Sequence, residues 1–234
     1  MKKLLKNIFI LIMLSGIVVG GFYTYMGYGM YKSAIKKTSI REMAESIKSR
    51  DNYVSLEDLP KTYIKAVIAV EDHRFYNHGT IDFLAIGRAL WNNLKSWSLV
   101  EGGSTITQQL VKNLYFTQEK KVERKVAEVF MGRDLERIYG KDQVLELYVN
   151  TIYFGSGYYC VYDASMGYFG VEPQRMTDYQ CTILAGIPNA PSVYSLKESP
   201  ELASKRQKQV LKNMVKYGYI TDEKSQEILK SIDN

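Results

Sequence analysis

Two segments of the chain carry side chains of the types and spacing that acid–base and anion chemistry require. The first, EDHRFYNHGTID, sets Glu71 and Asp72 side by side, with His78 on what the pattern predicts as the same helix. The second, EGGSTITQQLVKN, runs from two glycines into a hydroxyl-rich helix start with two amides and a lysine. Together they indicate a base beside a site for an anionic, oxygen-rich substrate. His78 taken alone is more simply a structural hydrogen-bonding residue than a catalyst.

Glu71 stands where the helical pattern calls for an apolar residue, because Ile68 and Phe75 lie on the same stripe. Burial disfavours a carboxylate, and the adjacent charge of Asp72 disfavours it further. Both effects raise the pKa of Glu71 toward the range of a general base. The alternative is a structural glutamate that forms an ion pair with Arg74 or with a lysine elsewhere.

The second segment has the features of an anion-binding helix start. Thr105 and Gln108 have capping-box spacing, so a helix is expected to begin near Ile106. Free backbone N–H groups and the positive end of the helix dipole favour an anion at such a start. The Walker spacing is absent. The alternative is an ordinary capped surface helix. The polar faces of this helix carry Gln108, Gln109, Lys112 and Asn113, whose side chains are able to hold sugar hydroxyls or phosphate.

A third group lies in KKVERKVAEVF, where Arg124 and Glu128 are four residues apart and Lys125 is adjacent. One interpretation is an i,i+4 ion pair worth a few tenths of a kcal/mol. The other is a cationic clamp for phosphate with a second carboxylate beside it. Glu71 and Glu128 would then be the two acids that glycosyl chemistry usually needs, although the sequence does not place them near each other.

The composition is compatible with one sizeable folded domain or two small ones. The chain has 234 residues, of which 46% are hydrophobic, and a formal net charge of +6. A basic balance suits phosphate, anionic lipid or nucleic acid without choosing among them. Cys160 and Cys181 lack metal-ligand spacing, and we expect buried thiols, with a single disulfide as the alternative.

The N-terminus predicts a membrane anchor. Three lysines precede an uncharged run over 7–31, which as a helix spans about 37 Å. Lysines precede the span and none lies inside it, which predicts a single-pass anchor in the cell membrane. The N-terminus would then be cytoplasmic and the domain after the span extracytoplasmic. A cleaved signal peptide is the rival interpretation, but no A-x-A-like site follows the run. With the domain outside, we expect no nucleic-acid partner.

The remaining chain is expected to be mainly α-helical, with 1–31 as stub and anchor, 32–51 as a polar linker or juxtamembrane helix, and 52–234 as one domain. The best strand candidate is Thr151 to Tyr153. Gly218 is expected as a helix C-cap and Thr221 as the next N-cap. Helical patterns cover 60–77, 82–96, 105–115, 121–138, 141–150, 175–186, 200–217 and 222–232.

Residues 83–99 have the composition of a segment that lies on a membrane. Both tryptophans of the chain, Trp91 and Trp97, are here, with Arg88 and Lys95 nearby. The alternative is a core helix that happens to hold both tryptophans.

At the level of whole motifs the chain resembles the family 51 glycosyltransferases, the peptidoglycan glycosyltransferases. The resemblance runs from about Leu59 to the C-terminus and includes EDHRFYNHG with Asp82 and Arg88, GGSTITQQLVKN, RKVAE, KDQVLELYVN and LAGIPNAPSVYS in order. It implies a lysozyme-like helical domain behind a single N-terminal membrane helix.

The resemblance implies polymerisation of lipid II in peptidoglycan synthesis, and hence a role in cell shape. Glu71 matches the general base, which deprotonates the 4-hydroxyl of an acceptor N-acetylglucosamine. That oxygen attacks C1 of the growing strand, and undecaprenyl diphosphate leaves with inversion. Glu128 matches a second essential acid, and Lys112, Arg124 and Lys125 match residues that face the donor diphosphate. The full implied substrate-binding set is Asp72, Phe75, His78, Arg88, Ser104, Thr105, Gln108, Gln109, Lys112, Asn113, Arg124 and Lys125.

The resemblance also sets expectations for cofactors and partners. No cofactor is obligatory and no dedicated metal cage is expected, although Mg²⁺ or Mn²⁺ stimulates some members. Expected partners are lipid II, the growing glycan strand, the membrane and other wall-synthesis proteins such as transpeptidases. Moenomycin, an inhibitor of the family, is expected to bind. The chain lacks the motifs of a transpeptidase domain, so we expect a monofunctional enzyme.

The chain departs from the family pattern at Cys160, Gln180 and Asn189, and it lacks a proline after the Tyr194 region. These departures affect expectations for helix packing and the acceptor side more than for the reaction. Two alternatives stay open: a non-enzymatic scaffold of wall assembly, and a lysozyme-like enzyme that cleaves glycan. The retained acids and cations argue against the scaffold, and the diphosphate-suited cations argue against the cleaving enzyme.

Overall fold

The computed structural model describes residues 2–96, 102–116 and 121–231, and across these residues it contains helices and no strand. The predicted mainly α-helical fold is confirmed. The predicted strand over Thr151 to Tyr153 is wrong, because the Thr151 and Ile152 N–H groups both donate to the Tyr148 carbonyl oxygen in a turn that follows a helix. The α-helices are α1 (Lys2–Lys37), α2 (Ile40–Lys48), α3 (Lys61–Glu71), α4 (Phe83–Ser96), α5 (Ile106–Tyr115), α6 (Val122–Ile138), α7 (Lys141–Val149), α8 (Val161–Phe169), α9 (Asp178–Gly186), α10 (Pro200–Lys216) and α11 (Asp222–Lys230). Short 3-10 helices are η1 (Leu56–Asp58), η2 (Phe75–Asn77), η3 (Pro173–Arg175) and η4 (Ile187–Asn189).

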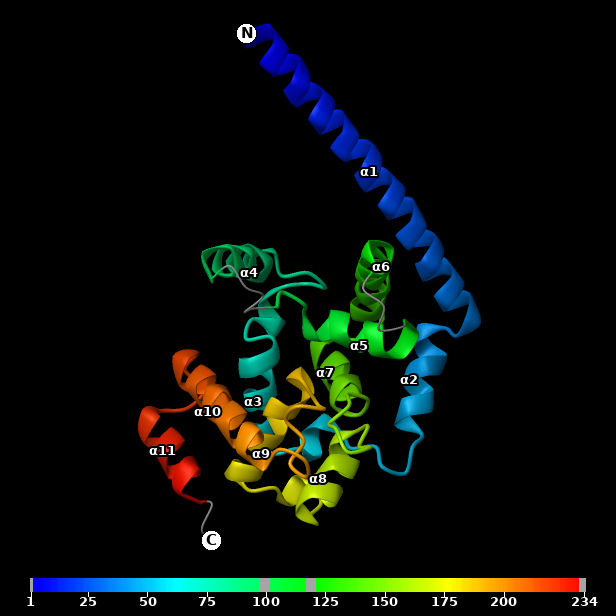
Figure 1. Ribbon diagram of the computed structural model, residues 1–234. Coiled ribbons are helices and arrows are strands. Elements are labelled where there is room, and N and C mark those ends of the chain that lie inside the picture. Colours follow the sequence, from blue (N-terminus) through cyan, green and yellow to red (C-terminus); the bar gives the residue numbers. More distant parts are fainter. Residues whose placement is uncertain (1, 97–101, 117–120, 232–234) are drawn as a thin grey trace.

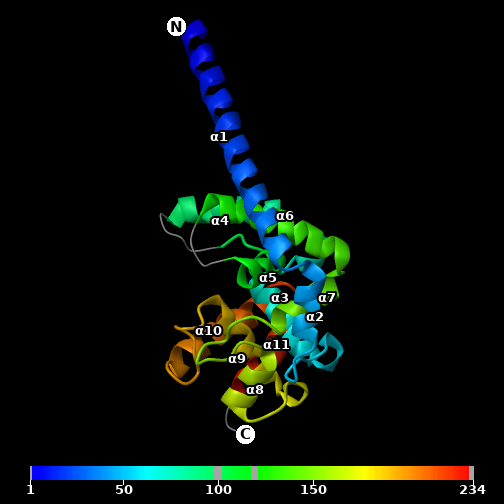
Figure 2. The same ribbon diagram turned by 90° about the vertical axis from the view of Figure 1, so that its right-hand side faces the viewer.

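Helix α1 is long and apolar enough to cross a membrane, and its most apolar stretch is not buried by the rest of the protein. It projects away from the other helices in both views (Figures 1 and 2). Its C-terminal part packs along α6. This contact is close at Gly27, where an added Cβ would lie 2.6 Å from Val126 Cβ and 2.7 Å from the Glu123 carbonyl oxygen. The Tyr31 hydroxyl donates to Asp134 at the same interface.

Two groups of helices form the core. Helix α3 packs against α9 and α10, which also pack against each other, and α5 packs against α6 and α7. Tyr63 on α3 and Tyr148 on α7 are among the largest fully buried side chains. Helix α2 adds Ile40, Ala44 and Ile47 to the same apolar cluster. The two groups meet where α3 ends and α5 begins.

The sequence places most helices within one or two residues of their observed bounds, but it overextends one and misses another. The predicted helix over 60–77 is wrong, because α3 ends at Glu71 and Asp72 leaves helical geometry with φ −159° and ψ 74°. Helix α8 was not predicted, since its N-cap is Cys160, whose sulfur accepts from the Asp163 N–H. Thr221 caps α11 as predicted, and Gly218 adopts the expected left-handed conformation with φ 74°.

Helix α4 is not a core helix, because Ala89 is its single buried residue. Apolar side chains on its surface are largely exposed, including Leu90 at 60%, Trp91 at 69% and Leu94 at 63%. Helices α4 and α6 lie at the end of the domain from which α1 projects (Figures 1 and 2). An exposed apolar face on that side suits contact with a lipid surface. The companion Trp97 lies outside the described residues.

We predict that Gly27→Val weakens the packing of α1 on α6. The new side chain would overlap Val126 and the backbone at Glu123, and overpacking of this kind costs roughly 1–3 kcal/mol. Gly21→Val is the matched control, because an added Cβ at Gly21 meets nothing within 4 Å and the helix-propensity change is the same. Thermal unfolding in detergent should show a lower Tm for Gly27→Val alone. Equal Tm values for the two variants would contradict the close contact.

Candidate active site

A polar cleft of about 480 Å³ lies where α3 ends, between α5 and the C-terminal part of α10. It brings together residues from segments far apart in the chain, including predicted site residues and several that the sequence analysis did not identify. Its polar lining residues are Glu71, Asp72, His73, Arg88, Ser104, Gln109, Lys112, Asn189, Arg206, Asn213 and Tyr217.

Glu71 is the last residue of α3, and its carboxylate is buried at the cleft. Its Oε2 accepts a hydrogen bond from Gln109 Nε2 at 2.9 Å, whereas Oε1 is buried without a hydrogen-bond partner. Burial raises the pKa of Glu71, and the charge of Asp72 adds to the rise. The Gln109 hydrogen bond, Arg206 and Lys112 oppose it. One oxygen of the Glu71 carboxylate is therefore left without a hydrogen-bond partner beside the cleft.

Asp72 connects the end of α3 to the start of α5. Its Oδ2 accepts from the Ile106 backbone N–H at 3.1 Å, and its Oδ1 lies 2.7 Å from His78 Nε2. The other ring nitrogen of His78 faces the Gly79 carbonyl oxygen. Asp72 and His78 are thus brought together, although they do not share a helix as predicted. Both of these side chains form hydrogen bonds with other groups of the protein, which fits a positioning role.

The start of α5 forms the predicted capping box. The Thr105 hydroxyl accepts from the Gln108 N–H at 3.1 Å, and Gln108 Oε1 accepts from the Thr105 N–H at 3.2 Å. Thr105 also donates to the Thr80 carbonyl oxygen. Both capping residues are buried and do not line the cleft, so their side chains set the helix start and are not open to a ligand. Phe75 is fully buried in the core as well.

Glu128 lies on α6 at the centre of a cluster of cations. It is fully buried; Arg124 donates to Oε1, and Lys125 Nζ lies 2.8 Å from Oε2. Lys125 also donates to Ser104 at 2.9 Å, which ties this group to the loop before α5. The i,i+4 pair expected from the sequence is therefore part of a larger network.

Lys112 connects the two acids electrostatically. It lines the same cleft as Glu71, and its half-buried ammonium interacts with the charges of both Glu71 and Glu128. Burial lowers the pKa of Lys112. The two carboxylates oppose the shift, and Arg124 and Lys125 add to it. The two acids that the sequence left unplaced thus act on one lysine.

A second cavity of about 440 Å³ continues past Lys112 and includes Asn113, so that predicted residue lies outside the Glu71 cleft. Gln109, Lys112 and Asn189 line both spaces. The rings of Tyr153 and Tyr159 lie 4.6 Å apart at its wall. The hollowed surface therefore extends to both sides of Gln109 and Lys112.

The sequence analysis missed the contribution of α10 and of His73. Arg206 faces the cleft from α10, and the charge of Arg206 acts on Glu71. Tyr217, which follows α10, stacks on His73 with ring centroids 3.9 Å apart. His73 in turn lies 3.4 Å from Arg88 Nη1, and burial together with Arg88 lowers the pKa of His73. No local sequence pattern predicts that these residues lie together, because they meet only when α10 packs on α3.

Among the residues that the structure describes, one group of side chains has the composition of a metal site, namely Asp72, His78 and Asp82, whose ligand atoms lie within 4.8 Å of one another. Asp82 Oδ2 is buried without a partner. However, both oxygens of Asp72 are engaged, and Asp82 Oδ1 accepts from the Leu84 and Ala85 N–H groups. A single open oxygen beside a hydrogen-bonded histidine does not fit the oxygen-rich shell that Mg²⁺ or Mn²⁺ requires.

Comparison with known proteins shows the family of the chain. A family profile described as Transglycosylase matches residues 36–215, and that range contains both acids and the cleft residues up to Asn213. The chain belongs to the transglycosylase family.

Relatives of this transglycosylase include proteins several times its length and one of similar length. Penicillin-binding protein 1A/1B of Bacillus subtilis is 42% identical over 82% of the chain and 21% of that protein. Penicillin-binding protein 1F of the same organism is 38% identical over 94% of the chain and 32% of that protein. A protein of Cupriavidus necator named as a transglycosylase is 39% identical over 73% of both chains. The chain thus spans about a fifth to a third of the length of the two penicillin-binding proteins.

Two departures of this transglycosylase from its family pattern have a structural account. Gln180 Oε1 accepts from the Thr177 N–H at 2.9 Å in a capping box, a position where glutamine serves as well as glutamate. Cys160 caps α8, and burial raises the pKa of its thiol to about 11. Cys160 and Cys181 are both free and buried, as expected for plain thiols.

We predict that Glu71→Gln stabilises the folded protein at neutral pH. An unfolded glutamate titrates near pH ~4.3, and burial raises the pKa of Glu71 in the folded state. The folded state therefore loses stability as pH rises from ~4.3 through the folded pKa, because the buried group ionises at a cost. A neutral glutamine avoids this cost.

Thermal unfolding between about pH 4 and pH 8 tests this stability prediction. The Tm of Glu71→Gln should exceed that of the wild type at neutral pH, and the difference should shrink toward pH 4. The control is Glu172→Gln, since Glu172 is a surface residue with an ion pair of 3.8 Å to Arg175. A lower Tm for Glu71→Gln at neutral pH would show that the ionised carboxylate stabilises the fold.

Proposed function

We propose that this transglycosylase polymerises lipid II into glycan strands. The observation that carries the proposal is that Glu71, whose buried Oε1 has no hydrogen-bond partner, lines the same cleft as Lys112, whose charge also interacts with Glu128. A base next to a concentration of cations is what glycosyl transfer from a diphosphate-linked donor needs.

In the proposed reaction Glu71 accepts the proton of the 4-hydroxyl of N-acetylglucosamine on the acceptor lipid II. The oxygen forms a bond to C1 of the N-acetylmuramic acid at the reducing end of the growing strand. The bond from C1 to the diphosphate oxygen breaks with inversion, and undecaprenyl diphosphate leaves with the electron pair. Lys112, Arg124 and Lys125 stabilise the negative charge that develops on this leaving group.

The acceptor also carries a diphosphate, and the cleft has separate cations for it. Arg206 and Arg88 line the Glu71 cleft from α10 and α4, and neither belongs to the Glu128 cluster. The acceptor hydroxyl would thus lie at Glu71. The donor diphosphate would lie on the Glu128 side of it, and the acceptor diphosphate would lie on the side of Arg206 and Arg88. The continuation of the cleft past Lys112 toward Tyr153 leaves room for the sugars of the growing strand.

The Glu128 cluster argues against a glycan-cleaving enzyme. Cleavage by two carboxyl groups requires one of them to donate a proton to the leaving sugar oxygen. Both oxygens of Glu128 are paired with cations, so this group serves to hold Arg124 and Lys125 in place. A diphosphate leaving group needs no such proton.

We predict glycan strands from purified full-length protein supplied with lipid II in detergent. Glu71→Gln should lose activity by about 10²–10⁴-fold, which is the usual contribution of a general base. Glu172→Gln serves as the control for removal of a surface carboxylate. Moenomycin binding by thermal shift would show that the inactive variant keeps its donor site. Product from both the wild type and Glu71→Gln would overturn the assignment of the base, and product from neither would favour the scaffold.

The lipid-linked substrates imply that the domain works against a membrane. We propose that α1 anchors the chain with its N-terminus in the cytoplasm and that the exposed face of α4 touches the outer leaflet. Leu90, Trp91 and Leu94 are exposed on that face, and it lies on the side from which α1 projects. Such a position would place the cleft within reach of lipid headgroups.

We predict that Trp91 inserts into the lipid of reconstituted vesicles. The chain has two tryptophans, so Trp97→Phe leaves Trp91 as the reporter. Its fluorescence should be quenched by phospholipids with brominated acyl chains and protected from aqueous iodide. The reverse pattern would place α4 in water. Leu90→Glu in the same background is expected to reduce the quenching by brominated lipid, since a charge at the interface opposes insertion.

A further inference from the structure

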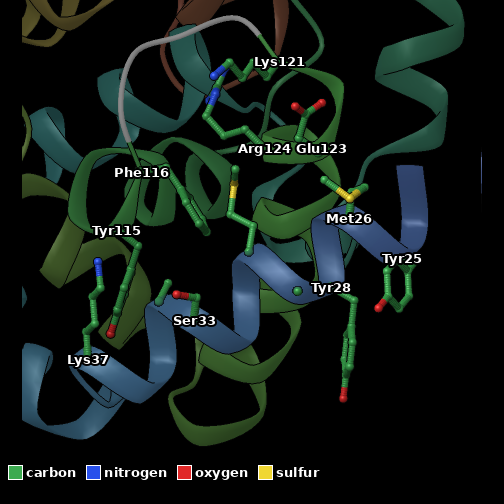
Figure 3. A pocket seen from close by; sticks show the side chains of 13 residues that line it. Tyr25, Met26, Tyr28, Ser33, Lys37, Tyr115, Phe116, Lys121, Glu123 and Arg124 are labelled. Atoms are coloured by element: carbon green, nitrogen blue, oxygen red, sulfur yellow. The ribbon is translucent and has the colours of Figure 1, made fainter. Parts of the chain in front are cut away.

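A groove of about 660 Å³ is lined by residues of α1, of the end of α5 and of the start of α6. Figure 3 shows its walls: Tyr25 and Met26 lie at one end, Phe116 lies in the middle, and Lys121 and Arg124 lie along one edge. Most of its lining is apolar, and its charged lining residues are three cations, Lys37, Lys121 and Arg124, and one acid, Glu123. None of the residues assigned to the Glu71 cleft lines this groove.

The groove is a built feature of the fold because α1 is held firmly against α6. Gly27 allows close approach to Val126, and Tyr31 donates to Asp134. The neighbouring face of α1, with Gly29 and Ser33, is left exposed to the groove. One side of the anchor helix therefore packs on the domain, and the next side forms an apolar wall.

Charge complementarity indicates the chemistry of the occupant. Arg124 lines the groove and also pairs with Glu128, so this one side chain borders both the groove and the proposed donor site. Lys121 and Lys37 line the groove too. The other end reaches Tyr25 and Met26, which belong to the apolar part of α1. An apolar chain with an anionic head at Arg124 fits this arrangement.

We propose that the groove holds the polyprenyl chain of the diphosphate-linked donor. This rests on the proposed function, which places the donor diphosphate at Arg124 and Lys125. From there the chain would pass Phe116 and Met30 and follow α1 toward Tyr25 and the membrane. The anchor helix is then part of the donor site as well as a tether. A phospholipid is the weaker fit, because its phosphate at Arg124 would occupy the place of the leaving diphosphate.

The test uses the full chain in vesicles and a polyprenyl diphosphate that carries a diazirine in its chain. All samples carry Glu71→Gln, so that labelling does not depend on turnover. After photolysis, mass spectrometry of peptides should find the label on α1 around Met26 to Met30 and at Phe116. Excess unlabelled undecaprenyl diphosphate should compete, and excess phosphatidylglycerol should not.

Gly29→Phe is the blocking variant, since an added Cβ at Gly29 meets nothing within 4 Å and the ring can fill the groove. Displacing one or two buried methylene-sized contacts should cut specific labelling about tenfold. Gly21→Phe is the matched control, because Gly21 is equally open but lies outside the groove. Ser33→Phe offers a second block in case Gly29→Phe unfolds, which thermal shift with moenomycin would reveal.

The outcomes of this experiment distinguish a failure of the groove proposal from a failure of the proposed function. Label confined to α4, or equal loss in Gly29→Phe and Gly21→Phe, would overturn the groove proposal even if lipid II is polymerised. Label at Met26 to Met30 that phosphatidylglycerol removes and undecaprenyl diphosphate does not would identify a phospholipid seat and overturn it as well. Specific labelling without any polymerisation by the wild type would uphold the groove and contradict the proposed function.

Discussion

The site depends on the carboxylate of Asp72, which joins the end of one helix to the start of another. Its Oδ2 satisfies the N–H of Ile106 at the positive end of α5, and its Oδ1 contacts His78. Because this link draws Asp72 out of helical geometry, α3 ends at Glu71 and presents that side chain at the edge of a cleft. Gln109 lies on the first turn of α5, so the same link places its amide 2.9 Å from Glu71.

The site combines a buried acid whose charged form is disfavoured with a group of cations that would favour a bound anion. Burial raises the pKa of Glu71 and lowers the pKa of Lys112, so both groups are held in surroundings that disfavour their charged forms. Arg124, Lys125 and Lys112 are three cations around the one carboxylate of Glu128. A diphosphate would neutralise this excess, and it would do so most strongly as its charge increases on leaving. Because burial raises the pKa of Glu71, an acid-to-amide change there is expected to favour stability, and under the proposed function it would reduce activity.

Local signals in the sequence predict what local physics decides. The capping box of Thr105 and Gln108 and the spacing of Arg124 and Glu128 are short-range, and both appear in the structure. Thr105 and Gln108 are buried in helix capping, although the family resemblance places both among the substrate-binding residues. The end of α3 was predicted wrongly because a tertiary bond to Ile106 overrides the helical periodicity. Arg206 was missed for the same reason, as its place in the cleft follows from packing of α10 and not from any local pattern.

The packing of α1 on α6 gives the anchor a geometric consequence for the chemistry. Helix α6 carries Arg124 and Glu128, and Gly27 brings α1 against it without space for a side chain. If α1 anchors the chain in a bilayer as proposed, the height and tilt of α1 would set the height of Arg124 above the membrane, and the exposed face of α4 would give the domain a second point of contact. Two contacts with one surface would restrict rotation of the domain far more than one does. In this proposed arrangement a substrate whose tail stays in the membrane would reach Glu71 along the routes that α1 and α4 leave open, and the fold would orient the lipid before the cleft engages the sugar.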